Sequence, residues 1–292
     1  MNNSGGWGSN RKDVGKEPRF GVRSSGRKRE EESSLQRCGF NGKVKKKASI
    51  CLTMPTRYTV PVDGDEVVAV HHRPDADSDG WLFFSHGFVS DKEGSYVGRC
   101  ERAAAEGYNA VRFDHRGCGE SDLSFGEQNL STRVADLRAV IDYFDPPSSV
   151  LFGSSFGGKV VFHIGIDKPS VEAIGTRAPV TYTEPFENYR QEVGSGGDTG
   201  SGWGAVADDF FEDLGSYGFG EVEDEIDVPV VVFHGRDDAT VRVEQSFDAV
   251  AALETDASLH AYADEGHSFS REAEKRLRDT FFGWLETTVF PE

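Results

Sequence analysis

The sequence predicts an α/β fold in which a mostly parallel sheet carries helices on both of its faces. From Arg57 onward, short apolar runs typical of buried strands alternate with segments that have the apolar period of a helix. Polar or glycine-rich residues follow directly after several of these runs, and in parallel sheets function lies at the carboxyl ends of the strands. With 292 residues, 37% of them hydrophobic, the chain can bury one large core.

The first expected elements form a hairpin. The apolar runs Arg57–Val62 and Glu66–His72 flank Asp63-Gly64, a dipeptide that favours a tight turn between antiparallel strands. Trp81–Ser85 follows as a short, continuous apolar run, which is typical of a strand buried on both faces.

Alternation continues through the middle of the chain. A helix is expected over Tyr96–Glu106, because this segment is rich in alanine and Gly107 stands where helices often end. Asn109–Phe113 is the next expected strand. Leu130–Phe144 has apolar side chains at helical spacing and is stopped by Pro146-Pro147.

One segment, residues 177–227, interrupts the pattern. It is rich in glycine, acidic residues and aromatic residues, and it is too long for an ordinary loop. We therefore expect a small inserted cap over the functional site. The remaining expected strands and helices are Val171–Thr176, Val228–Phe233, Val243–Leu253, Ser258–Tyr262 and Arg271–Val289.

The pattern Gly153-Ser154-Ser155-Phe156-Gly157 lies between an apolar strand and a helix-compatible run. Lifting a serine hydroxyl off the end of a buried strand requires a sharp turn, with the following helix passing close behind it. A Cβ atom at Gly153 or Gly157 would obstruct that path. Ser155 is then a candidate nucleophile at a helix N-terminus, where backbone N–H groups favour negative charge.

This stretch is also compatible with two other interpretations. Gly153 to Lys159 also fits the phosphate-binding pattern G-x-x-x-x-G-K, but Val160 stands where that pattern needs a hydroxyl to hold magnesium. The stretch is also compatible with a tight turn that carries an idle serine. The decision between these interpretations depends on whether a base and an acid follow in workable order.

Two downstream strand ends offer such partners. Asp237 and Asp238 follow one apolar strand, and His267 follows the last one. A serine hydroxyl is a weak nucleophile that needs a base, and the base needs an orienting carboxylate. The chain therefore offers a base and a carboxylate after Ser155, in the order serine, aspartate, histidine. Either Asp237 or Asp238 could be the carboxylate.

Taken together, these motifs resemble those of the α/β-hydrolases, over about Arg57 to Pro291. The resemblance implies that His-Gly-x-x-Asp places the acid at Asp238, with Asp237 as the alternative, and that Gly-His-x-Phe places the base at His267. His86-Gly87-Phe88 is similar to the family's oxyanion segment. The implied oxyanion donors are the backbone N–H groups of Phe88 and Phe156.

An α/β-hydrolase fold with a small inserted cap and a Ser155, His267, Asp238 triad implies a serine hydrolase that cleaves a carboxylic ester through an acyl-enzyme. The stretch after His86 is similar to small acyl esterases of the feruloyl-esterase and monoglyceride-lipase kind. No cofactor or metal is expected, and the partner is a small acyl substrate. Alternatives are an aminopeptidase, which would use acidic cap residues, and a non-catalytic binding module on the same fold.

Other polar residues near strand ends are given structural roles. We expect His86 and His234 to shape turns, His163 to pack in a helix, and Asp114 and Arg116 to form a local ion pair in their loop. His115 is a further loop residue that could touch substrate. These residues have no predicted catalytic partner.

Charge is distributed unevenly along the chain, whose formal net charge is −18. Residues 1–53 carry 13 basic and 5 acidic side chains, whereas the rest carries 19 basic and 45 acidic ones. Such an acidic body makes nucleic acid an unsuitable partner and resembles proteins of salt-loving archaea. The basic segment is expected to be disordered, either as a solvated tail or because translation starts at Met54, with a nucleic-acid or targeting patch as the alternative.

The four cysteines have no paired or metal-like spacing, so reduced thiols are expected. No apolar run approaches the ~18 residues of a membrane-spanning helix, and the N-terminus has no apolar signal region. The expected location is therefore the cytoplasm, with no membrane partner.

Overall fold

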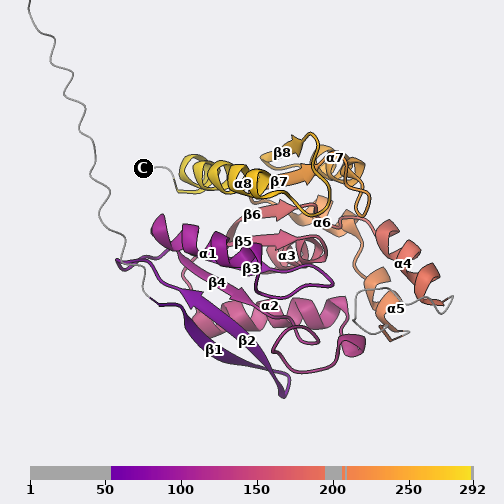
Figure 1. The fold of residues 1–292 in the computed structure, drawn as a ribbon, viewed down its shortest axis with the longest axis horizontal. Coiled ribbons are helices and arrows are strands. Elements are labelled where there is room, and N and C mark those ends of the chain that lie inside the picture. Colours follow the sequence, from indigo (N-terminus) through magenta and orange to yellow (C-terminus); the bar gives the residue numbers. More distant parts are fainter. Residues whose placement is uncertain (1–53, 195–205, 208, 291–292) are drawn as a thin grey trace, which may run out of the picture. The chain divides into compact units, whose positions relative to one another are not determined.

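The computed structural model describes residues 54–194, 206–207 and 209–290 (Figure 1). The predictions made for residues 1–53 lie outside this range. Cys100 and Cys118 are buried free thiols, as predicted, while the other two cysteines are outside the described residues.

A single eight-stranded sheet forms the frame, with strand order β1-β2-β4-β3-β5-β6-β7-β8. The first strands form the predicted hairpin, with Asp63 and Gly64 at φ 54° and 99°, and β2 also pairs antiparallel with β4. Every later pairing is parallel, so the predicted fold class is confirmed. The strands are β1 Thr56–Val62, β2 Asp65–His72, β3 Trp81–Ser85, β4 Asn109–Phe113, β5 Ser149–Ser154, β6 Val171–Arg177, β7 Val230–Gly235 and β8 Ala257–Tyr262.

Helices cover both faces of this sheet. Alternate residues of β3 show the division: Phe83 packs into the core beneath α2, α3 and α7, whereas Leu82 and Phe84 pack beneath α1 and α8. None of the helices in the described ranges is long and apolar enough to cross a membrane. The longer helices are α1 Ser95–Ala105, α2 Leu130–Phe144, α3 Phe156–Asp167, α7 Val243–Ala252 and α8 Arg271–Trp284.

The segment between β6 and β7 contains three described helices, α4 Glu184–Gly194, α5 Asp209–Gly215 and α6 Phe219–Glu225. Asp213 of α5 accepts hydrogen bonds from the backbone N–H groups of Leu130 and Ser131, at 2.8 and 3.0 Å, and so ties the segment to the start of α2. We call residues 178–229 the insertion. Arg177, which the sequence placed in the cap, is instead the last residue of β6.

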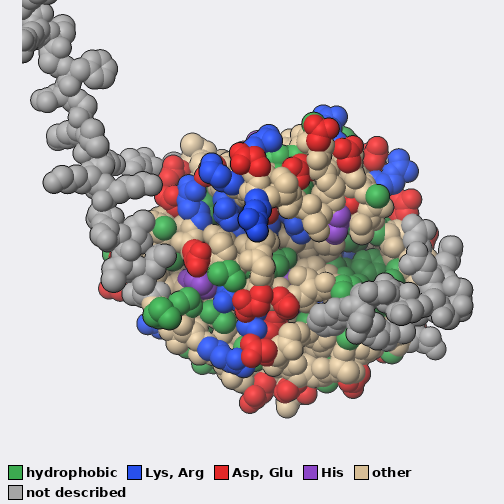
Figure 2. All heavy atoms as spheres, in the orientation of Figure 1, with side chains coloured by type: hydrophobic (Ala, Val, Ile, Leu, Met, Phe, Trp, Pro, Cys, Tyr) green, Lys and Arg blue, Asp and Glu red, His purple; other side chains and the backbone are tan. Residues whose placement is uncertain are grey.

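Acidic side chains are spread over the visible face of the molecule, and Lys and Arg side chains gather over α1 and α8 (Figure 2). We predict that the folded state weakens at low salt, because carboxylate repulsion is then unscreened. The melting temperature should rise by roughly 5 °C or more between dilute buffer and multimolar KCl, the shift that about 2 kcal/mol produces in a chain of this size. Equal melting temperatures in the two solutions would refute this halophilic interpretation.

Candidate active site

The turn between β5 and α3 holds Ser155 in a backbone conformation that side chains rarely adopt, with φ 53°. Two glycines make the turn possible. A Cβ atom on Gly153 would lie 2.2 Å from the carbonyl oxygen of Gly157, and one on Gly157 would lie 2.3 Å from that of Ser85. The helix therefore passes directly behind the strand, as the sequence predicted, and Ser155 is left at its N-terminus.

Ser155 is the first member of a hydrogen-bonded chain of three side chains. Its Oγ lies 3.0 Å from His267 Nε2, and His267 Nδ1 lies 2.8 Å from Asp238 Oδ2. The partners are distant in sequence, since Ser155 follows β5, Asp238 follows β7 and His267 follows β8. Asp237, the alternative acid, is exposed and uses its backbone N–H to bond Glu265.

Asp238 is held as an anion. Burial on its own raises the pKa of this carboxyl, but hydrogen bonds from His234 and His267 outweigh burial and hold the pKa well below its usual range. The other carboxylate oxygen accepts from the N–H groups of Thr240 and Val241 at 2.8 and 2.9 Å. An ionised, fixed carboxylate beside His267 can orient the imidazole and stabilise its protonated form.

His234 was expected only to shape a turn, and it also contacts Asp238, the third member of this hydrogen-bonded chain. Its Nε2 lies 3.1 Å from Asp238 Oδ2 and 2.8 Å from the carbonyl of Val241, while Nδ1 lies 2.7 Å from Ser246 Oγ. His234 is fully buried, so it can fix the position of the Asp238 carboxylate but cannot contact substrate.

The two expected oxyanion donors flank Ser155. Phe156 is the first residue of α3, so its N–H has no partner within the helix. Phe88 follows Gly87, where a Cβ atom would lie 3.3 Å from the Cβ of Ser155. The rings of Phe88 and Phe156 pack edge to face, with centroids 5.5 Å apart.

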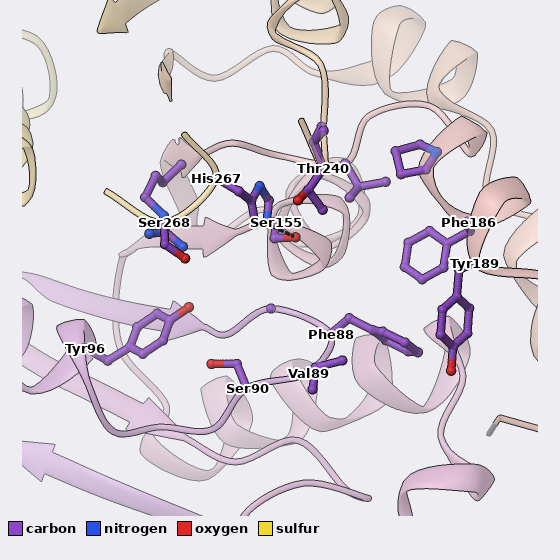
Figure 3. A pocket seen from close by; sticks show the side chains of 15 residues that line it. Phe88, Val89, Ser90, Tyr96, Ser155, Phe186, Tyr189, Thr240, His267 and Ser268 are labelled. Atoms are coloured by element: carbon purple, nitrogen blue, oxygen red, sulfur yellow. Dashed lines mark hydrogen bonds between the residues drawn. The ribbon is translucent and has the colours of Figure 1, made fainter. Parts of the chain in front are cut away.

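A cavity of about 400 Å³ opens in front of Ser155. In Figure 3, Phe88, Phe186 and Tyr189 form an aromatic wall on one side of Ser155 and His267, and Tyr96 and Ser268 lie on the other side. Figure 2 shows hydrophobic side chains gathered in a hollow near α4 and α5. The insertion thus contributes to the wall, through Pro185, Phe186 and Tyr189 of α4. The full lining is Gly87, Phe88, Val89, Ser90, Tyr96, Ser155, Arg177, Val180, Pro185, Phe186, Tyr189, Thr240, Val241, His267 and Ser268.

A buried ion pair that no sequence motif indicates supports the turn at Ser155. Arg99 of α1 binds Glu274 of α8 through two hydrogen bonds of 2.6 and 3.0 Å, and its Nη1 donates to Ser154 Oγ at 3.0 Å. Burial raises the pKa of Glu274, but the charge and hydrogen bonds of Arg99, together with the charges of Arg177 and Arg278, outweigh burial and lower the pKa overall.

We predict that Glu274→Ala costs about 3–5 kcal/mol of folding stability, because it leaves Arg99 as a buried charge without its anion. Chemical denaturation measures the change. The double variant Arg99→Met/Glu274→Leu should recover much of the loss, since neither charge then remains. A single variant as stable as the double variant would contradict this account.

Two predictions about polar residues need correction. Asp114 and Arg116 do not pair with each other: Asp114 binds Lys92 at 2.7 Å, and Arg116 binds Asp136 at 2.6 Å. His115, which could have touched substrate, is fully buried, and its Nε2 lies 2.8 Å from Ser85 Oγ. It is not among the residues that line the cavity.

Two residues of α3 have structural contacts. His163 packs against Tyr217, as expected for a packing residue, with ring centroids 5.0 Å apart. Lys159, the residue of the phosphate-binding alternative, is buried and donates to the carbonyl of Thr181 at 3.1 Å. Burial lowers the pKa of Lys159 to about 8.

Comparisons with known proteins agree with this architecture. A family model described as serine aminopeptidase, S33, matches residues 76–191. Among curated proteins, the chain is 30% identical over 89 residues to a mitochondrial palmitoyl-protein thioesterase of Bos taurus, and 33% identical over 88 residues to a proline iminopeptidase of Lactiplantibacillus plantarum. Each match spans 30% of this chain, and the chain spans about three-tenths of each relative, 29% and 31% respectively.

Solved structures resemble the chain over a greater length. Est1E from Butyrivibrio proteoclasticus, with bound ferulic acid, superposes with a TM-score of 0.68 at 18% identity, covering 77% of this chain and 98% of that one. The α/β-hydrolase domain-containing protein 10 from mouse gives 0.63 at 19% identity, covering 80% and 99%. At these identities the likeness shows the fold. Together with the family match over residues 76–191, it shows that the chain has the α/β-hydrolase fold.

Proposed function

We propose that this protein is a serine hydrolase that cleaves small carboxylic esters or thioesters through an acyl-enzyme. The observation that carries the proposal is the hydrogen-bonded chain from Ser155 through His267 to Asp238, with Ser155 and His267 both lining one cavity. Nucleophile, base and orienting acid are the three parts that acyl transfer by a serine requires.

In the proposed reaction, His267 accepts the Ser155 proton as Oγ attacks the acyl carbonyl. The N–H groups of Phe88 and Phe156 donate to the oxyanion of the tetrahedral intermediate. His267 then gives its proton to the departing alcohol or thiol, which leaves the acyl group on Ser155. Water, deprotonated by His267, attacks this ester and releases the acid, and Asp238 stabilises the imidazolium in both steps.

An ester or thioester suits the cavity better than an aminopeptidase substrate. Anchoring a free α-amine calls for a carboxylate, and among the described lining residues there is none. Asp213, one of the acidic residues of the insertion, is instead committed to the start of α2. The relatives include both a thioesterase and an iminopeptidase, so their names fit either chemistry. The lack of a carboxylate among the described lining residues favours the ester or thioester.

A fluorophosphonate probe tests the proposal, because it labels only an activated serine. We expect tandem mass spectrometry to find the label on Ser155 and not on Ser154. The enzyme should hydrolyse 4-nitrophenyl butyrate far faster than aminoacyl 4-nitroanilides. Absence of label would favour the non-catalytic binding module, and faster turnover of the anilides would favour the aminopeptidase.

A further inference from the structure

The cavity in front of Ser155 has two unlike ends. At one end the rings of Phe88, Phe186 and Tyr189 meet, with the Phe88 centroid 5.2 Å from Phe186 and 5.4 Å from Tyr189. The other end is polar and contains Tyr96 and Ser268 (Figure 3). Arg177 also lines this cavity. Apart from His267, Arg177 is the one basic residue among the described lining residues.

Arg177 is placed beside the nucleophile by the sheet. It ends β6, pairs with Ser154 of β5, and its carbonyl accepts the backbone N–H of Ser155 at 2.9 Å. Its guanidinium lies 5.7 Å from the ring centroid of Phe269, the residue after Ser268. The side chain is thereby fixed at the polar end of the cavity.

The charge of Arg177 has no direct counter-ion in the described part of the chain. No carboxylate there lies within 4.0 Å of its guanidinium, and its Nε is buried without a hydrogen-bond partner. The nearby carboxylates are occupied, since Glu274 binds Arg99 and Asp238 binds His267. Burial lowers the pKa of Arg177, as expected for a cation short of compensation, although an arginine stays protonated.

Arg177 is only partly buried, but its buried Nε lacks a partner and its charge lacks a direct anion, which is costly. A bound carboxylate would offset this cost through two parallel N–H···O hydrogen bonds. We propose that Arg177 is a specificity-determining residue that binds a carboxylate carried by the ester substrate, with the hydroxyls of Tyr96 and Ser268 as further donors. This proposal rests on the proposed ester hydrolysis. Because Arg177 and Ser155 share a cavity of about 400 Å³, the carboxylate lies only a few bonds from the scissile carbonyl.

Matched substrate pairs test the proposal and locate the anion. One pair places the carboxylate on the acyl side (mono-4-nitrophenyl adipate against 4-nitrophenyl hexanoate), and the other on the leaving group (3-carboxyphenyl butyrate against phenyl butyrate). For one pair, kcat/KM should be greater for the charged ester. In Arg177→Met the ratio of charged to neutral kcat/KM should fall by about ten- to a hundredfold, and Arg177→Lys should restore part of it.

The control is Arg276→Met, the same change at an exposed arginine outside the cavity, which should leave both ratios unaltered. Preference for the neutral ester in both pairs, or ratios that Arg177→Met leaves unchanged, would overturn the proposal. Calorimetric titration of Ser155→Ala with monomethyl adipate measures carboxylate binding without turnover, and so tests the anion site separately from ester hydrolysis. Binding that disappears in Ser155→Ala/Arg177→Met supports the anion site even if no ester is cleaved, whereas equal binding by both variants, or none by either, refutes it.

Discussion

Replacing Ser155 by alanine is expected to lower kcat for 4-nitrophenyl butyrate by about three orders of magnitude or more. The oxygen of this hydroxyl forms the acyl-enzyme in the proposed reaction, and among the described residues it is the one group that hydrogen-bonds to Nε2 of His267. The Ser155 side chain is only partly buried, and its hydroxyl bonds His267 at 3.0 Å, so stability should change little. Steady-state kinetics and a thermal melt on the same preparation measure the two effects.

Ser154→Ala is the matched control for this experiment. Ser154 is fully buried and accepts a hydrogen bond from Arg99, so its loss affects stability by about 1 kcal/mol and leaves the nucleophile in place. Turnover should therefore survive in Ser154→Ala and disappear in Ser155→Ala. The reverse pattern would show that the wrong serine has been assigned.

The second large effect is expected from Gly157→Ala, which should destabilise the fold by about 3 kcal/mol. The added Cβ would lie 2.3 Å from the carbonyl oxygen of Ser85 and 2.6 Å from that of His86. Both atoms belong to the backbone, so relief requires β3 and α3 to move apart. That movement would also displace the adjoining Gly87-Phe88 segment, and ester hydrolysis should fall along with stability.

Gly220→Ala provides the comparison, because nothing lies within 4 Å of a Cβ atom at this position in α6. An alanine in an open helical position gains about 1 kcal/mol of helix propensity, so this variant should be neutral or slightly more stable. Chemical denaturation of the two variants side by side makes the test. Equal stability of Gly157→Ala and Gly220→Ala would contradict the close approach of strand and helix.

Much of the frame could be predicted because its signals are local. Trp81–Ser85 and Asn109–Phe113 are apolar runs with polar or glycine boundaries, and the structure gives both strands these bounds. β7 was placed two residues too early, since His234 and Gly235 look like a strand end but still pair with β8. The last helix was predicted to reach Val289, whereas α8 ends at Trp284 and a π-helical turn follows it.

The candidate site likewise contains residues that the sequence indicates and one that it does not. Ser155, Asp238 and His267 carry recognisable motifs, and the structure brings them within hydrogen-bonding distance. No sequence motif marks Arg177. Its proposed role depends on whether nearby carboxylates already bind other cations. That depends on contacts between residues far apart in sequence, such as Arg99 with Glu274, 175 residues away. Distant pairings also explain why the local ion pair of Asp114 and Arg116 was wrong.

Ser155 and His267 follow strands that differ in their stability against local opening. Ser155 follows a fully buried strand in the interior of the sheet, whereas His267 follows β8, a half-exposed strand at the edge, paired on one side only in the described ranges. Edges of this kind open locally at a lower free energy than the core. On heating, fraying of β8 would separate the two residues while the remaining sheet stays paired, so inactivation should precede denaturation and should reverse on cooling.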